Sequence, residues 1–255
     1  SASTHLCRSF TPPPTGVPPN ISGTATTSFT RTNTWDLVKK VLNSSGQWVD
    51  ETQIETETDQ ATATYQVAIT KTTADSNAVV SGSLQISNPG SSGISVTLAF
   101  TTAGCTTPAP LTFTVSSLQT TTRTYTCSLA AVANGAVGVS ASWTGGATGT
   151  ATYSLPYTFG QPSTVVKPYV TVTDQLEGAP TATTIAETYD PLTVTYTGNL
   201  PATTTCPVMA GPDGDPTDKY TNTARMYNGP VNDNPVTGTK LKEDIADVLL
   251  QLRAG

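Results

Sequence analysis

The stretch Ala61–Lys71, ATATYQVAITK, decides the fold class of this chain. Apolar residues take its odd positions, from Ala61 through Tyr65 to Ile69, and mostly hydroxyl or amide residues take its even positions. A β-strand points successive side chains to opposite faces, so this alternation predicts a strand with one apolar and one solvated face. Most other segments repeat the pattern, and we therefore expect an all-β protein.

Short alternating segments separated by turn residues indicate a β-sandwich. Asn88-Pro89-Gly90 and Gly145-Gly146 are typical turn sequences between such segments. Glycine and proline interrupt the pattern again around residues 160–168, where we place a boundary. The expected division is a Pro-rich leader with an extended strand (1–35), a β-sandwich (36–160), a second, smaller β domain (161–238) and a C-terminal helix (239–255).

The helix is predicted from a change of period near the C-terminal end of the sequence. Thr239 is a suitable N-cap, and apolar residues follow on one helical face: Leu241, Ile245, Val248, Leu249 and Leu252. A helix of this length is marginal by itself, so its apolar stripe must dock. Docking on its own chain and docking on a neighbouring subunit are both open.

Composition excludes several classes of partner. The chain has 255 residues, of which 12% are charged, and a formal net charge of −6. Nucleic acids and anionic membrane surfaces attract basic proteins, so neither is expected as a partner. No apolar run approaches the roughly 20 residues that span a bilayer. Because the sequence opens on Ser1 without Met, we expect a processed, secreted protein.

Four cysteines fit an oxidising compartment. Proximity in the sequence favours a Cys105–Cys127 disulfide, which would stabilise by about 3 kcal/mol if unstrained. Cys7 and Cys206 then remain, and they could pair within one chain or between subunits. Four cysteines allow three connectivities, so this pairing is a preference. A metal site is not expected, because C-x-x-C spacing is lacking and His5 is the single histidine.

The sequence offers little chemistry for catalysis. His5 lies in the leader, where it is poorly placed for a Ser-His-Asp or Cys-His device. Neither a Gly-x-Ser-x-Gly elbow nor a phosphate-binding loop is present. A glycosidase would need two converging carboxylates, which a single sequence does not reveal. We therefore predict a protein that is not an enzyme and has no cofactor.

Two acidic stretches have a structural and a cation-binding interpretation. The run from Asp50 to Asp59 fits a solvated edge that discourages wrong strand pairing, with cation binding as the alternative. The segment Asp213–Asp218 fits an Asp-rich turn, and its composition also suits a calcium loop, although it lacks EF-hand spacing.

The sequence contains candidate sites for attached glycans and a candidate residue for glycan binding. Asn20 and Asn43 begin Asn-x-Ser triplets and are candidate sites for N-linked glycosylation. Trp48, next to a turn, is the tryptophan most free to stack on a sugar, whereas Trp35 and Trp143 lie on apolar faces and fit a core.

Three phrases carry a resemblance to known proteins. They are FTRTNTWD (Phe29–Asp36), VSGSLQISNP (Val80–Pro89) and YTNTA (Tyr220–Ala224). Together they resemble Thr-rich, Ig-like β-sandwich modules of large bacterial secreted and surface proteins, over residues 29–227. Green-algal surface glycoproteins are similar in composition. The resemblance implies an Ig-like sandwich in a secreted or cell-surface protein.

The parts of the chain are also similar to pilins that assemble by donor-strand exchange. In such an assembly an extended strand of one subunit fills the incomplete sandwich of the next, which generates an open filament. Thr24–Trp35 would be the donor strand here, with Phe29, Arg31 and Trp35 as its contact residues. The alternative is that this strand pairs within its own domain.

We therefore predict a secreted structural subunit of an extracellular, pilus-like fibril that is a homopolymer. The alternative function is a cell-surface adhesin or carbohydrate-binding module that recognises glycans through loops and Trp48.

Overall fold

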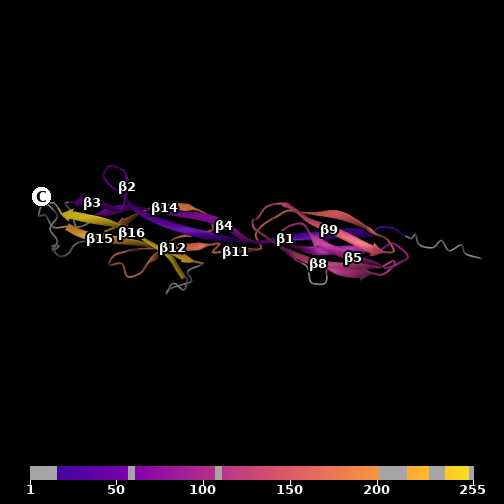
Figure 1. The fold of residues 1–255 in the computed structure, drawn as a ribbon. Coiled ribbons are helices and arrows are strands. Elements are labelled where there is room, and N and C mark those ends of the chain that lie inside the picture. The colour runs from indigo at the N-terminus through magenta and orange to yellow at the C-terminus, as the bar shows by residue number, and fades with distance from the viewer. Residues whose placement is uncertain (1–15, 57–60, 107–110, 201–216, 230–238, 253–255) are drawn as a thin grey trace, which may run out of the picture. The chain divides into compact units, whose positions relative to one another are not determined.

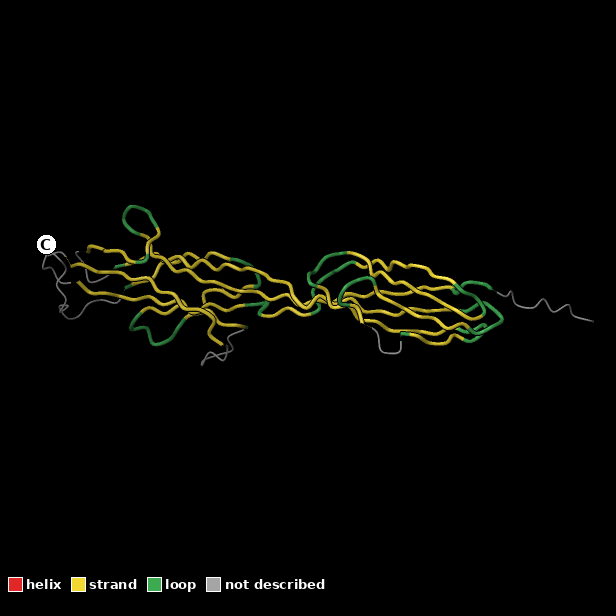
Figure 2. The backbone as a smooth tube through the Cα atoms, viewed as in Figure 1, coloured by secondary structure: helices red, strands yellow, loops and turns green. Residues whose placement is uncertain are grey.

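The computed structural model describes residues 16–56, 61–106, 111–200, 217–229 and 239–252. Every regular element in these ranges is a β-strand, and Figure 2 shows only strands and loops there. The prediction of an all-β, sandwich-type fold is confirmed. The chain forms two compact units: unit 1 comprises Ser1–Arg31 and Asp75–Thr164, and unit 2 comprises Thr32–Ala74 and Val165–Gly255.

Two long neighbouring strands, β1 (Asn20–Leu42) and β4 (Thr62–Ser87), contribute to both units (Figure 1). Strand β1 passes from unit 1 to unit 2 after Arg31, and β4 returns to unit 1 after Ala74. The units therefore differ from the expected segments, because residues 32–74 belong with the second half of the chain. The expected boundary at residues 160–168 does contain one crossing, between Thr164 and Val165.

Unit 1 is built from two facing sheets. The first has the order β1-β4-β8-β6 and the second has the order β10-β9-β5-β7. Their inward residues form one core cluster that includes Leu84, Ile94, Tyr125 and Trp143. The remaining strands of this unit are β5 (Ile94–Phe100), β6 (Cys105–Thr106), β7 (Thr112–Val115), β8 (Thr120–Leu129), β9 (Gly135–Gly145) and β10 (Gly149–Tyr157).

Unit 2 packs the other halves of β1 and β4 against a second sheet, of order β13-β12-β15-β16-β3. Strand β14 pairs with β4, and β2 pairs with β1. The short strand β11 also lies next to β1. The strands new to this unit are β2 (Trp48–Val49), β3 (Glu51–Thr56), β11 (Thr164–Val166), β12 (Val170–Leu176), β13 (Thr183–Thr188), β14 (Leu192–Asn199), β15 (Thr217–Asn228) and β16 (Thr239–Leu252).

Residues 62–71 of the stretch ATATYQVAITK lie in β4, as the alternation predicts. Ala63, Tyr65, Val67 and Ile69 are each at most 2% exposed, and they form part of the two core clusters of unit 2. Thr64, Gln66 and Ala68, which stand between them, are partly exposed. Hydrophobic burial of alternate side chains therefore determines which face of β4 is turned inward here.

The predicted C-terminal helix is wrong, because residues 239–252 form strand β16. This strand pairs antiparallel with β15 and parallel with β3. Ala246, Val248 and Leu250 point into the core, while Ile245 is 44% exposed. The apolar residues fit a period of two as well as a helical period, and pairing on both sides overrides the helix propensity of Leu, Ala, Glu and Lys.

Gly82 determines how closely β1 approaches β4 in unit 1. Gly82 is paired with Tyr125 of β8, and the Tyr125 hydroxyl donates a hydrogen bond to the Thr24 carbonyl of β1 at 2.8 Å. A Cβ atom at position 82 would overlap that same carbonyl. The missing side chain therefore lets the tyrosine hydroxyl reach across β4 to β1.

We predict that Gly82→Ala lowers the free energy of unfolding by about 2–3 kcal/mol, because the new methyl group overlaps backbone that can move only by separating two strands. Chemical denaturation measures the loss. Gly160→Ala is the matched control, since a Cβ there meets no atom within 4 Å, and it should change stability by less than about 0.5 kcal/mol. Equal effects of the two substitutions would contradict this assignment.

Candidate functional site

The three residues predicted for a donor strand all have partners in their own chain. Phe29 is buried in unit 1 and packs edge-on against Phe159, with ring centroids 5.8 Å apart. Arg31 forms two hydrogen bonds to Asp75, which lower the pKa of that carboxyl below its usual value. Trp35 is buried in unit 2. This placement corresponds to the alternative in which the strand pairs within its own domain.

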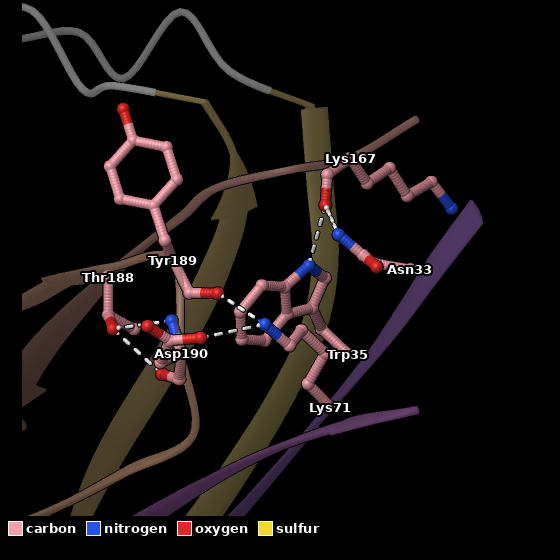
Figure 3. Close-up of polar contacts among 7 residues, drawn as sticks. All are labelled: Asn33, Trp35, Lys71, Lys167, Thr188, Tyr189 and Asp190. Carbon is pink, nitrogen blue, oxygen red and sulfur yellow. Dashed lines mark hydrogen bonds and ion pairs between the residues drawn. The ribbon is translucent and has the colours of Figure 1, made fainter. Parts of the chain in front are cut away.

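A polar cluster surrounds Trp35 in unit 2 (Figure 3). The indole N–H of Trp35 and the side-chain amide of Asn33 both donate to the Lys167 carbonyl, at 2.9 and 3.1 Å. Lys167 has a φ of 51° and precedes Pro168, a backbone conformation that non-glycine residues rarely adopt. The two side-chain donors therefore hold a strained turn in place.

Lys71 connects the same cluster to the loop after β13. Its ammonium lies 5.3 Å from the Trp35 ring centroid and donates to the Tyr189 carbonyl and to the Asp190 carboxylate. Asp190 is held in turn by Thr188, whose hydroxyl donates to the Asp190 carbonyl and accepts from its N–H. The polar groups drawn in Figure 3 bind mainly one another, which suits a structural role.

The first residues of β1, Asn20–Ser28, form an open edge of unit 1; we call them the edge segment. Strand β4 lies on one side of them. The other neighbour, β11, begins only after Ser163, whose N–H donates to the Phe29 carbonyl. The inward positions of the edge segment carry Ile21, Gly23 and Ala25, which are only partly buried. This part of β1 is therefore held less firmly than the part that follows.

A second cluster, inside unit 2, contains a fully buried lysine. Lys39 of β1 is 0% exposed and contacts the carboxylate of Asp174 on β12. Its ammonium also donates to the Tyr196 hydroxyl at 2.6 Å and lies over the rings of Tyr65 and Tyr196, 4.9 and 5.3 Å from their centroids. The backbone N–H of Lys39 donates to Asp244 of β16 at 2.7 Å.

Burial shifts the protonation equilibria of this cluster. Desolvation lowers the pKa of Lys39 below its usual value, although the Asp174 and Asp244 carboxylates act in the opposite direction. Burial raises the pKa of Tyr65 to about 12. Burial and the neighbouring Asp174 carboxylate also raise the pKa of Tyr196. Among the described residues, Tyr65 Oη and Asn222 Oδ1 lack a hydrogen-bond partner. Perturbed and unpartnered groups of this kind mark a candidate site for chemistry.

The sequence contains a signal for a buried Lys39, although the prediction from the sequence did not include this residue. Inward positions of β1 in unit 2 are Asn33, Trp35, Leu37, Lys39 and Val41. A lysine two residues after Leu37 therefore continues the apolar row. Asp174 likewise follows Val170 and Val172 at a spacing of two residues, so it continues their row. A register shift after Val172 made the face of Asp174 harder to predict.

The predicted disulfide is confirmed. Cys105 of β6 lies opposite Cys127 of β8, and their sulfur atoms are bonded. Cys7, Cys206 and His5 lie outside the described residues.

The acidic stretches are placed only in part. Asp50 pairs with Lys40, and Glu51 lies near Lys219 at 3.5 Å, as on a solvated edge. Residues 57–60 and most of 213–218 fall outside the described ranges. In the part of the chain that is described, groups of three or more residues that could hold a metal ion are not found. A helix able to cross a bilayer is also not found among the described residues.

The candidate glycan positions lie at the two ends of β1. Asn20 is exposed at the start of the strand. Asn43 follows its last residue, and its side-chain oxygen accepts the N–H groups of Ser45 and Gln47 in a tight turn. Trp48 is half-buried in β2, so it is less free than its position beside the turn indicates.

Neither known family models nor curated proteins match this chain.

We predict that Asn33→Ala and Trp35→Phe lower stability more in combination than the sum of their separate effects. Each single variant leaves one hydrogen-bond donor to the Lys167 carbonyl, whereas the double variant leaves the carbonyl with neither donor. The double variant should therefore lose about 1 kcal/mol of unfolding free energy beyond the sum of the single effects. Chemical denaturation of the four proteins in a double-mutant cycle measures this coupling.

The control cycle combines Asn33→Ala with Thr64→Val. The Thr64 hydroxyl bonds the Thr197 hydroxyl and shares no partner with Asn33, so these two effects should add. Additive losses in the first cycle as well would contradict a shared acceptor.

Proposed function

We propose that this protein is a secreted structural subunit of an extracellular fibril, and that subunits join by exchanging the edge segment of β1. In this assembly residues 20–28 of one subunit take the place of the same residues beside β4 of another. The proposal keeps the Ig-like, strand-exchanging subunit that the sequence indicates. It moves the exchanged part from Thr24–Trp35 to the residues that precede Phe29.

The observation that carries the proposal is the contrast within β1. Before Phe29 the strand lies at an open edge and its small inward residues are partly buried. From Asn33 to Val41 the inward residues are buried, and they are bonded or packed within unit 2. An edge strand with a modest buried surface exchanges at a lower cost than a central one.

Few bonds hold the edge segment beyond its pairing with β4. Tyr125 donates to the Thr24 carbonyl, and the hydroxyls of Thr24 and Thr26 bond Ser83 and Ser81 of β4. On the other side, the Thr27 hydroxyl donates to the Thr158 carbonyl at 3.0 Å. An incoming copy of the same segment can form every one of these bonds again. Exchange between subunits therefore leaves the bonding unchanged and costs mainly the entropy of association.

A glycan-binding module remains the second candidate, favoured by an aromatic pair in unit 2 of which Tyr189 is exposed and Tyr169 is half-buried. Tyr189 is 63% exposed, and its ring centroid lies 4.7 Å from that of Tyr169. Exposed tyrosine rings offer an apolar face with a polar tip, which suits contact with sugars. A glycan array tests this candidate, with Tyr189→Ala as the variant that should lose binding.

Strand exchange predicts that cysteines placed across β1 and β4 link different subunits. The hydroxyls of Thr24 and Ser83 lie 3.2 Å apart, so Thr24→Cys together with Ser83→Cys should form a disulfide there. In fibrils we expect a ladder of covalent multimers on a denaturing gel without reductant. Cys7→Ser and Cys206→Ser are included in every protein, so that their thiols do not contribute.

Each single cysteine variant in the same background is a control, and neither should give the ladder. Fibrils whose chains migrate as internally bonded monomers would show that β1 stays in its own subunit. Absence of fibrils from the native protein, in negative-stain images, would remove the proposed function itself.

A further inference from the structure

The Lys39–Asp174 contact connects the two sheets of unit 2 through its interior. Lys39 belongs to β1 and Asp174 belongs to β12, which lie in different sheets. The side chains are 0% and 9% exposed. Neighbouring inward positions carry Leu37, Val41 and Val172, each at most 1% exposed. An amine and a carboxyl group therefore touch inside the unit, between apolar side chains and the rings and hydroxyls of two tyrosines.

An ordinary ion pair accounts poorly for this arrangement. An ammonium group has three donors, and among the described residues Nζ contacts one carboxylate and one hydroxyl. Removing both charges from water is costly, and their attraction repays the cost only when the remaining hydrogen bonds are made. Aromatic rings cover much of the rest of the ammonium. A neutral product of the two groups would avoid the cost.

We propose that Lys39 and Asp174 condense after folding to form an intramolecular amide bond between Nζ and Cγ. The inference does not depend on the proposed function, because a crosslink of this kind would form in a monomer as well as in a fibril.

The reaction needs no reagent beyond the two side chains. Proton transfer from the ammonium to the carboxylate gives a neutral amine and a neutral carboxylic acid. The lone pair of Nζ attacks Cγ and forms the C–N bond. Nζ then loses one proton, the C–O bond to the leaving hydroxyl breaks, and the proton and hydroxyl depart as one water molecule.

The surroundings favour each of these steps. Burial disfavours the charged form of Lys39, and the lowered pKa of this amine increases its reactive, neutral fraction. The Tyr196 hydroxyl accepts a hydrogen bond from Nζ, and its pKa is raised partly by Asp174, so it lies close to both reacting groups. It is placed to carry the proton from the nitrogen to the leaving oxygen, as a general acid–base group does.

Mass spectrometry of the intact, denatured wild-type protein tests the inference. We expect a mass lower by one water than the sequence requires after reduction of the disulfide. Digestion should give one branched peptide that joins the fragment with Lys39 to the fragment with Asp174. The wild-type measurement does not depend on the folding of any variant.

Peptide sequencing must locate the lost water, because the Asp213–Gly214 pair can lose water by forming a succinimide. A full mass, or a loss confined to residues 213–214, would overturn the inference. An unmodified peptide that contains Lys39 as the major species would overturn it as well.

Variants separate the two reacting groups from the group that assists them. Lys39→Met and Asp174→Ala should each restore the full mass. Tyr196→Phe should slow the loss of water after refolding while leaving the same product, which distinguishes proton transfer from a purely structural role. Lys71→Met is the control, since the Asp190 partner of Lys71 is 84% exposed and that pair should stay ionic. Loss of water that persists in Lys39→Met would contradict the assignment.

Discussion

The pairing of β1 with β4 is the constraint on which both cores depend. The two strands provide part of one wall of unit 1 and part of one wall of unit 2, so each core needs both strands. The two strands place their buried residues differently along the sequence. Buried residues of β1 stay at odd positions throughout, whereas those of β4 change from odd positions up to Ile69 to even positions from Ala78 onward.

Asn77 explains where the change in β4 takes place. Its φ is 53°, and the residues from Thr72 to Asn77 are mostly exposed. One residue outside the normal strand conformation shifts the alternation by one position, as a β-bulge does. Asparagine is among the few residues other than glycine that adopt this conformation readily. The shift lets one strand present an apolar face to each core.

The period-two pattern made much of this fold predictable. The alternation in Ala61–Lys71 and the turn sequences were sufficient for the all-β fold and for most strands, because burial of alternate side chains is a local property. The sharing of β1 and β4 between two units was not predictable, since it depends on contacts between residues far apart in the sequence. Residues 239–252 were assigned to a helix for the same reason: their final pairing, with residues 51–56, is absent from any local window.

The candidate site was only partly visible in the sequence. Phe29 and Trp35 were identified as apolar strand residues, and both are buried. Lys39 was missed because a lysine is ordinarily assigned to the surface, even in an apolar row. Its partner lies 135 residues away in the sequence, so one chain alone gives no indication of the contact. Buried polar groups are the features that residue type predicts least well.

The parallel contact between β3 and β16 has a consequence for the order of events during synthesis. Unit 1 has all of its strands once the chain is complete to Thr164, whereas unit 2 lacks its last strand until residues 239–252 have been made. Because domains generally fold as units while the chain emerges, unit 1 can mature first. Val41, Ala63 and Tyr65, which pack against β16, then stay uncovered until the last strand has been made, and the unfinished unit is exposed to association with other chains.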